Sequence, residues 1–263
     1  MNILDKIVAD KRKEVSLKKG LIPTSQLEAS VLFERNCVSL AQALCNSNTG
    51  VIAEHKRRSP SKQTINQNTN VGVVAKGYEK AGVCGMSVLT DIKYFGGSLE
   101  DLLLARASVT MPLLRKEFMI DEYQVIEAKA HGADVILLIA AVLTREDIKT
   151  LSELAKSLGM DVLLEVHNQE ELDKSIMPSL DMLGVNNRNL KTFEVSLNTS
   201  KNLSKLIPDD FVKVSESGIS SIEAITELRK FGYKGFLIGE NFMKTENPGL
   251  SAKQFIEGLK KNT

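Results

Sequence analysis

Charged side chains in this sequence follow short apolar runs, where several of them can meet in one pocket. Glu54 and Lys56 come directly after residues 51–53, and because side chains alternate along a strand, both can point to the same side. Lys116 follows another apolar run, and Glu165 lies inside a third, where a residue that only binds water is not expected. Carboxylates and ammonium groups in a partly apolar pocket are suited to moving protons. These residues therefore predict general acid–base chemistry.

A second set of strand ends carries groups that can bind anions. Asn186 and Arg188 share one side after the run 182–185, and the planar guanidinium of Arg188 suits a carboxylate or a phosphate. Gly218 and Gly239 follow the last two runs, where backbone N–H groups can approach an anion closely. The same two runs are also followed by Glu216, Ser217 and Glu240. This pattern predicts a phosphorylated ligand.

Each of these residues also has a structural interpretation when it is taken alone. Ion pairs can fill the interior of a barrel, a lysine can be solvated in a turn, and a glycine can serve turn geometry. Five of the eight apolar runs, however, end in Glu, Lys, Asn or Arg, and buried charges are costly unless they are paired or used. The combination favours an enzyme that moves protons on an anionic phosphosugar, without a metal.

The elements that must position these side chains alternate along the chain. Eight β-like runs start 20 to 34 residues apart with amphipathic segments between them, which is typical of parallel strands joined by helices. The runs are residues 51–53, 85–89, 111–114, 135–139, 162–166, 182–185, 211–214 and 236–238. The helical segments are 73–81, 99–107, 123–131, 146–158, 169–175 and 222–231. The sequence predicts a single (β/α)8 TIM barrel rather than a doubly wound sheet, since no G-x-G-x-x-G motif follows the first run.

The first 50 residues precede this barrel pattern. Helical periodicity at 3–17, 27–33 and 40–44 predicts an N-terminal helical extension, residues 1–50, packed on a barrel of residues 51–263 in one structural domain. A mobile leader is the alternative. It is disfavoured because it would leave an apolar face in water. That face consists of Leu4, Ile7, Val8 and Val15.

Composition argues against several classes of protein. The 34 Lys and Arg residues against 33 Asp and Glu leave a net charge of +1, too balanced for nonspecific nucleic-acid binding. The longest apolar run, residues 135–143, is about half as long as a membrane span. The three cysteines form no Cys-x-x-Cys pair, which favours a reducing cytoplasm over zinc or redox chemistry. The dispersed histidines are expected at the surface rather than on a metal. They are His55, His131 and His167.

Motifs at these strand ends carry a family resemblance over nearly the whole chain. In chain order they are residues 52–62, 87–91 with 94–98, 114–118, 132–134 with 137–139, 164–167, 184–190, 215–219 and 237–240. Together they resemble the indole-3-glycerol phosphate synthase family. The resemblance implies a (β/α)8 barrel with an N-terminal helical extension. It also implies a tryptophan-biosynthesis lyase that converts 1-(2-carboxyphenylamino)-1-deoxyribulose 5-phosphate to indole-3-glycerol phosphate, with release of carbon dioxide and water.

The family roles carry over to matching positions of this chain. The catalytic positions are Glu54, Lys56, Lys116, Glu165, Asn186 and Glu216. The substrate-binding positions are Ser59, Arg188 and Ser217, with Phe95, Phe118 and Leu137 in the aromatic pocket. The phosphate-binding positions are Gly218, Gly239 and Glu240. No cofactor is expected, because the iminium formed at ring closure is itself the electron sink. We expect a cytoplasmic monomer or weak homodimer that binds a small phosphosugar, without nucleic-acid or membrane partners.

The reaction needs several proton transfers, which we assign as follows. Lys116 is the general acid at the ketone, with a pKa lowered by Phe118 and other apolar groups. Glu165 accepts a proton in the later dehydration. Lys56 orients the substrate carboxylate or acts as an acid in dehydration, while Glu54 holds both lysines by hydrogen bonds.

The two anionic ends of the substrate are assigned to different groups. We expect the phosphate against backbone N–H groups near Gly218 and Gly239, and the arene carboxylate on Arg188. Two positions depart from the family pattern. Gln63 stands where glycine is common, in a loop at 62–70 that also lacks the usual Asp-Pro, so loop closure is expected to differ. His55 replaces an apolar or aromatic residue and is expected to face away from the barrel interior.

Two rival functions remain. A barrel such as phosphoribosylanthranilate isomerase would handle a related substrate, but the catalytic cysteine expected near its first strand is absent here. A noncatalytic phosphosugar-binding barrel would keep the anion site without the acid and base. The presence of Lys56, Lys116 and Glu165 argues against that second alternative.

Overall fold

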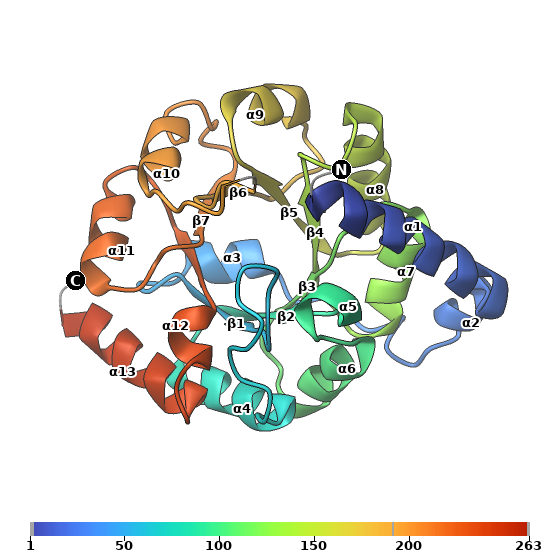
Figure 1. The fold of residues 1–263 in the computed structure, drawn as a ribbon, viewed down its shortest axis with the longest axis horizontal. Coiled ribbons are helices and arrows are strands. Elements are labelled where there is room, and N and C mark those ends of the chain that lie inside the picture. The colour runs from blue at the N-terminus through green and yellow to red at the C-terminus, as the bar shows by residue number, and fades with distance from the viewer. Residues whose placement is uncertain (1–2, 191, 262–263) are drawn as a thin grey trace.

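Eight parallel strands close into a barrel in the computed structural model of the chain, which describes residues 3–190 and 192–261 (Figure 1). Each strand pairs with the next along the chain, and the last pairs with the first, so the sheet has no free edge. The strands are β1 Val51–His55, β2 Gly85–Leu89, β3 Leu113–Lys116, β4 Val135–Ile139, β5 Asp161–Val166, β6 Met182–Asn186, β7 Val212–Glu216 and β8 Gly235–Ile238. The predicted (β/α)8 TIM barrel is confirmed.

Helices surround the strands in the view of Figure 1. Those of the barrel are α4 Val71–Ala81, α5 Ile92–Phe95, α6 Leu99–Ser108, α7 Glu122–Ala130, α8 Arg145–Ser157, α9 Gln169–Ser175, α10 Asn198–Leu203, α11 Ile222–Arg229, α12 Glu240–Met243 and α13 Pro248–Lys261. Local sequence sets where several begin, because Ser98, Thr144 and Asn168 accept hydrogen bonds from the first turns of α6, α8 and α9. Within the described ranges, none of the helices is long and apolar enough to cross a membrane.

Both faces of the strands are buried, which explains their nearly continuous apolar runs. Ile52, Leu114 and Leu137 belong to a cluster inside the barrel, whereas Ala53 and Leu138 belong to the layer between strands and helices. The alternation of these residues along each strand follows the two-residue period of extended chain. Polar side chains that follow the same alternation at the carboxyl ends of the strands are therefore aimed into the mouth of the barrel.

Two strands begin later and end later than the apolar pattern predicts. β3 starts at Leu113 instead of residue 111, after Pro112, which has no N–H to donate to a neighbouring strand. β7 starts at Val212 and ends at Glu216. As a result, Lys116 and Glu216 are the last residues of hydrogen-bonded strands rather than members of loops, so their backbones are fixed by the sheet.

Three helices were not expected from the sequence: α5, α10 and α13. The first two are one or two turns long, too short to show a helical period. The α13 helix buries Ala252, Ile256 and Leu259, whose spacing is helical, so its pattern was present in the sequence. The segment predicted as a helix at 27–33 is instead the end of α2, Thr24–Glu28, followed by turns.

The N-terminal helices lie at two different ends of the barrel. The α1 helix, Ile3–Leu21, crosses the edge of the mouth, shown in dark blue in Figure 1, and buries Ile7 and Val15. The α3 helix, Leu40–Cys45, adds Leu40 and Leu44 to the cluster inside the barrel. Just before α3, Ser39 Oγ donates to a carboxylate oxygen of Asp161, the first residue of β5, at 2.8 Å. The extension therefore contacts both the mouth and the opposite end of the barrel.

The expectation that the three histidines lie at the surface is wrong. His55 is 1% exposed, because helices cover the outer face of the strand on which it lies. Burial, together with the charge of Arg57, lowers the pKa of His55 to about 4. His131 and His167 are half-buried. In the part of the chain that the structure describes, no group of three or more His, Cys, Asp and Glu side chains is placed to hold a metal ion.

Candidate active site

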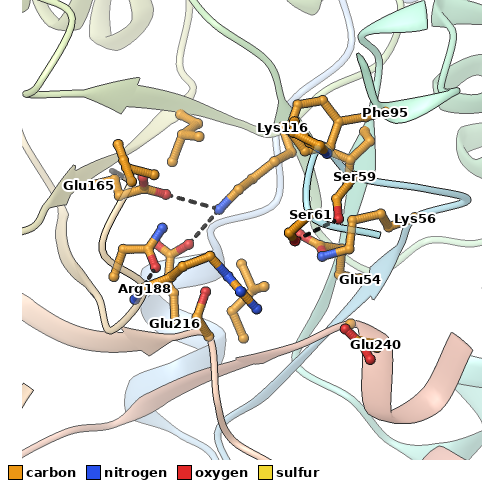
Figure 2. Close-up of a pocket in the computed structure, with 18 of the residues that line it drawn as sticks. Glu54, Lys56, Ser59, Ser61, Phe95, Lys116, Glu165, Arg188, Glu216 and Glu240 are labelled. Atoms are coloured by element: carbon orange, nitrogen blue, oxygen red, sulfur yellow. Dashed lines mark hydrogen bonds and ion pairs between the residues drawn. The ribbon is translucent and has the colours of Figure 1, made fainter. Parts of the chain in front are cut away.

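A cavity of about 390 Å³ opens at the carboxyl ends of the strands. Every residue singled out from the sequence as catalytic, substrate-binding or phosphate-binding lines this cavity. They are Glu54, Lys56, Ser59, Phe95, Lys116, Phe118, Leu137, Glu165, Asn186, Arg188, Glu216, Ser217, Gly218, Gly239 and Glu240. Figure 2 shows Lys116 of β3 pointing toward Glu165 of β5 and Glu216 of β7, with Glu54 and Lys56 on another side of the cavity. The carboxyl ends of parallel barrel strands meet at one face, which is why residues so far apart in sequence gather here.

Lys116 lies at the centre of this cluster, between two carboxylates (Figure 2). Its Nζ is 3.3 Å from Glu165 Oε2 and also forms a short ion pair with Glu216 Oε2. Burial alone would lower the pKa of Lys116, but the charges of Glu216, Glu165 and Glu54 outweigh burial and raise that pKa. The expected lowering by Phe118 is therefore wrong. The geometry describes a lysine that stays protonated and can act as a fixed proton donor.

The pKa of Glu216 is raised, although a neighbouring lysine ordinarily lowers the pKa of a glutamate. Burial raises its pKa to about 7, Lys116 opposes the rise, and the nearby charge of Glu165 adds to it. Its Oε1 has no hydrogen-bond partner among residues 3–190 and 192–261. Gly184 on the neighbouring strand makes room for this carboxylate, since a Cβ there would overlap Oε1. Glu216 can therefore exist as acid or carboxylate near neutral pH.

Glu54 and Lys56 form a second ion pair on the other side of the mouth. Lys56 Nζ is 2.6 Å from Glu54 Oε1. Burial would raise the pKa of Glu54, but Lys56 and Lys116 together lower it. The expectation that Glu54 hydrogen-bonds both lysines is wrong for this structure, because Lys116 instead bonds to the carboxylates of Glu165 and Glu216. Glu54 acts on Lys116 through charge alone.

Gly239 leaves room for the carboxylate of Glu54. A Cβ at position 239 would lie 2.5 Å from Glu54 Oε1. Ser217 and Gly218 form the neighbouring turn with φ values of 67° and 75°. Ser217 therefore adopts a left-handed backbone conformation, which residues other than glycine rarely adopt. Such conformations are frequent in functional loops.

One wall of the cavity is apolar. The rings of Phe95 and Phe118 lie 6.0 Å apart between centroids, at an angle of 40°. Leu137 lies on the same cavity from β4, and α1 contributes Ile3, Leu4 and Ile7. The contribution of α1 to this wall was missed from the sequence. Its apolar face was visible, but nothing in the local pattern says which surface that face covers.

Glu165 is bonded on more than one side. Burial would raise its pKa, whereas Lys116, His167 and a hydrogen bond from Asn186 lower it, and the net change is a lowering. The Oδ1 of Asn186 also accepts from the backbone N–H of Arg188 at 3.0 Å. Arg188 Nη1 donates to the carbonyl of Phe193 at 3.2 Å, and the arginine lines the cavity. Glu165 is thus a carboxylate ready to accept a proton.

Solved structures of low identity share the barrel fold. A 3-hexulose-6-phosphate synthase from Salmonella typhimurium matches with a TM-score of 0.63 at 13% identity, over 81% of this chain and 100% of that one. At this identity the likeness concerns the fold alone, because many unrelated chemistries use the same barrel.

Relatives found by sequence have a much higher identity to this chain. A family model described as indole-3-glycerol phosphate synthase matches residues 4–255, which include every residue singled out above. The indole-3-glycerol phosphate synthase of Bacteroides thetaiotaomicron is 47% identical over 98% of this chain and 99% of the relative. The protein of that name from Dechloromonas aromatica is 44% identical over 94% of this chain and 96% of the relative. With matches that span both the barrel and the α1 helix at its mouth, this chain belongs to the indole-3-glycerol phosphate synthase family.

Proposed function

We propose that the residues around Lys116 carry out the synthase reaction of the family on 1-(2-carboxyphenylamino)-1-deoxyribulose 5-phosphate. The observation that carries this proposal is the ammonium of Lys116 between the carboxylates of Glu165 and Glu216, beside an apolar wall. A proton donor and a proton acceptor are thereby available within one cavity. An apolar wall suits the arene ring of this substrate.

Lys116 is the general acid of ring closure. The arene carbon that carries the carboxylate attacks the ketone carbon, and Nζ of Lys116 gives the ketone oxygen a proton. Loss of carbon dioxide then returns a bonding electron pair through the newly formed iminium, and the ring regains its aromaticity. Glu216 is suited to return a proton to Lys116, because its pKa of about 7 makes both of its forms available near neutral pH.

Glu165 accepts the proton that is removed in the final dehydration. Hydroxide leaves the ring carbon that carries the side chain, and the neighbouring CH₂ carbon loses a proton to Glu165. Lys56 either orients the substrate carboxylate or gives the leaving hydroxide its proton. Two protons are added to oxygen and one is removed from carbon, so each turnover takes up one proton from solution.

The two anionic ends of the substrate bind different groups in this proposal. Backbone N–H groups near Gly218 and Gly239 hold the phosphate, with Glu240 and Ser59 at its edge. Arg188 and Ser217 hold the arene carboxylate. All of these residues line the same cavity, which supports their use on one ligand.

The direct test is turnover of the synthetic substrate, followed by indole fluorescence. The wild-type chain is expected to release indole-3-glycerol phosphate. Replacement of Glu165 by Gln should lower kcat by about 10²-fold or more with little change in KM, because the amide keeps the shape but accepts no proton. Binding without turnover by the wild-type chain would favour the noncatalytic barrel, and a change in KM alone would remove Glu165 from its role.

We also propose a monomer or weak homodimer in the cytoplasm. The three cysteines are free thiols, as is usual in a reducing compartment. Size-exclusion chromatography with light scattering tests the first point, and a stable higher oligomer would contradict it.

A further inference from the structure

The two carboxylate oxygens of Glu165 face different partners. Oε2 is 3.3 Å from Nζ of Lys116, whereas Oε1 is 3.4 Å from Nε2 of His167. The other ring nitrogen of His167, Nδ1, is 3.1 Å from Oε2 of Glu171. Lys116, Glu165, His167 and Glu171 therefore form a continuous series of polar groups. The mechanism above uses only the first two.

The position of His167 is fixed by the first turn of α9. Its backbone N–H donates to Glu171 Oε2 at 2.9 Å, so the same carboxylate oxygen holds both the backbone and the ring. Asn168 Nδ2 donates to the other oxygen of Glu171 at 2.9 Å. Within the described residues, Nε2 of His167 is buried and makes no hydrogen bond. The ring nitrogen nearest Glu165 is thus held close to it and is free to gain or lose a proton.

This series leads from the active site toward water. His167 and Glu171 line a second cavity of about 710 Å³, which neighbours the catalytic one and shares Asn186 and Arg188 with it. The side chain of Glu165 is 5% exposed, while those of His167 and Glu171 are 10% and 16% exposed. His167 therefore connects a deeply buried carboxylate with a wetter region.

The charges around His167 favour its protonated form. Burial would lower the pKa of His167, but Glu171, Glu165 and Glu216 outweigh burial and raise it. In return, the charge of His167 is one of the effects that lower the pKa of Glu165. The second cavity is also lined by the charged residues Asp5, Glu170, Lys174, Arg188 and Glu194.

We propose that His167 is a positioning residue for Glu165 and exchanges protons between that carboxylate and water in the second cavity. This inference rests on the role proposed for Glu165. Between turnovers the ring of His167 exchanges protons with water in the second cavity and passes through the neutral form that carries its proton on Nδ1, beside Glu171. In that form Nε2 takes the proton from Glu165 Oε1, and the ring becomes the imidazolium that the surrounding carboxylates favour. No electrons leave the system, and Glu165 becomes a carboxylate again for the next turnover.

Replacement of His167 by Gln tests the proposal, because glutamine can donate a hydrogen bond but cannot carry a proton through its side chain. We expect kcat to fall roughly tenfold, less than the ~10² to 10⁴ of a direct acid or base, with KM unchanged. The acidic limb of kcat/KM should move to higher pH, because the imidazolium no longer lowers the pKa of Glu165. Added imidazole should restore part of the lost rate.

Two further variants complete the experiment. Glu171→Gln should move the pH profile in the same direction without altering the histidine. Glu170→Gln is the matched control, since Glu170 is exposed on the same turn and lines the same cavity. It should keep the wild-type profile. Circular dichroism checks folding, and His167→Asn replaces the glutamine variant if the latter does not fold.

The outcomes separate this inference from the proposed function. An unchanged kcat and pH profile in His167→Gln would overturn the inference. So would a loss of rate without a pH shift and without imidazole rescue, because that combination indicates a structural role only. If Glu165→Gln keeps full turnover, it is the proposed role of Glu165 that fails.

Discussion

Lys116 and the carboxylates around it determine one another's charge. Three glutamates keep the lysine protonated despite its burial, and the lysine in turn limits how far the pKa of Glu216 rises. A neutral side chain at position 116 would leave Glu165 and Glu216 close together in a buried site with no cation between them. Like charges in such a site favour protonation of one partner. The acid and the base of this site therefore cannot be altered independently.

Lys116→Met should abolish most turnover while the chain still folds. Methionine keeps a similar stem but supplies no proton, so kcat should fall by about 10² to 10⁴. The free energy of unfolding should also fall, because a buried cation is removed from its partners. Single-turnover fluorescence and circular dichroism measure both effects. Turnover near that of the wild type would exclude Lys116 as the general acid.

Arg188 and Gly218 should separate the two anionic ends of the substrate. Arg188→Ala should weaken inhibition by 2-aminobenzoate, a ligand with the arene carboxylate, and keep inhibition by inorganic phosphate. Gly218→Ala should do the reverse, because its φ of 75° disfavours any side chain and its backbone lies at the expected phosphate. A substitution at Gly239 is less informative, since it would displace Glu54. The opposite pattern of inhibition would mean that the two ends are assigned backwards.

Among the elements, α1 is held at the mouth of the barrel by buried ion pairs. Lys11 of α1 is 2% exposed and forms ion pairs with Asp91 at 3.0 Å and Glu117 at 3.1 Å. Asp91 follows β2, and Glu117 directly follows Lys116. Burial would lower the pKa of Lys11, but the two carboxylates outweigh it and raise that pKa. The helix that completes the apolar wall is thus fixed beside the central lysine.

Lys11→Met should therefore affect both stability and catalysis. Two buried carboxylates lose their cation, which typically costs about 3 to 5 kcal/mol of unfolding free energy. The value of kcat/KM should also fall, since Ile7 and Glu117 line the cavity. Lys19→Met is the matched control from the same helix, because its pair with Asp121 is largely exposed and worth about 1 kcal/mol or less. Urea unfolding that shows equal losses for both variants would contradict this role for α1.

At the scale of the whole molecule, the buried acid Glu216 should make stability depend on pH. Its pKa is about 7 in the folded chain against an ordinary value of 4.5. A raised pKa means that the folded chain binds this proton more tightly than the unfolded chain does. The associated stability is fully present below pH 4.5 and is lost as the pH rises toward 7.

Glu216→Gln should remove this dependence. The free energy of unfolding of the variant minus that of the wild type should be larger at pH 8 than at pH 5. The increase should be about 3 kcal/mol at most. Urea unfolding of both proteins at the two pH values measures the difference. Glu100→Gln, at an exposed glutamate of α6, provides the control. A pH-independent difference between Glu216→Gln and the wild type would show that Glu216 does not titrate in this way.

Local patterns along the chain are enough to predict the barrel and the residues at its mouth. Strand and helix periods are local, and parallel strands of one barrel end at the same face. A polar residue that follows an apolar run is therefore expected at the mouth of the barrel. Glu54 and Lys56 could be assigned to one side by alternation, and both line the cavity. The same reasoning predicts that Glu165, Asn186 and Glu216 lie at the mouth too, although Glu54 and Glu216 are 162 positions apart in the sequence.

The charge states and the surroundings of these residues depend instead on contacts between distant parts of the chain. Lys116 was expected to lose its proton easily, but its partners come from β5 and β7, and a pKa is the sum of burial and of charges through space. His55 was expected at the surface, but the helices packed over β1 bury it. The place of α1 on the apolar wall likewise depends on Asp91 and Glu117, which no local period relates to Lys11. Periodicity fixes the direction of a side chain along its own element, whereas its neighbours are set by how distant elements pack.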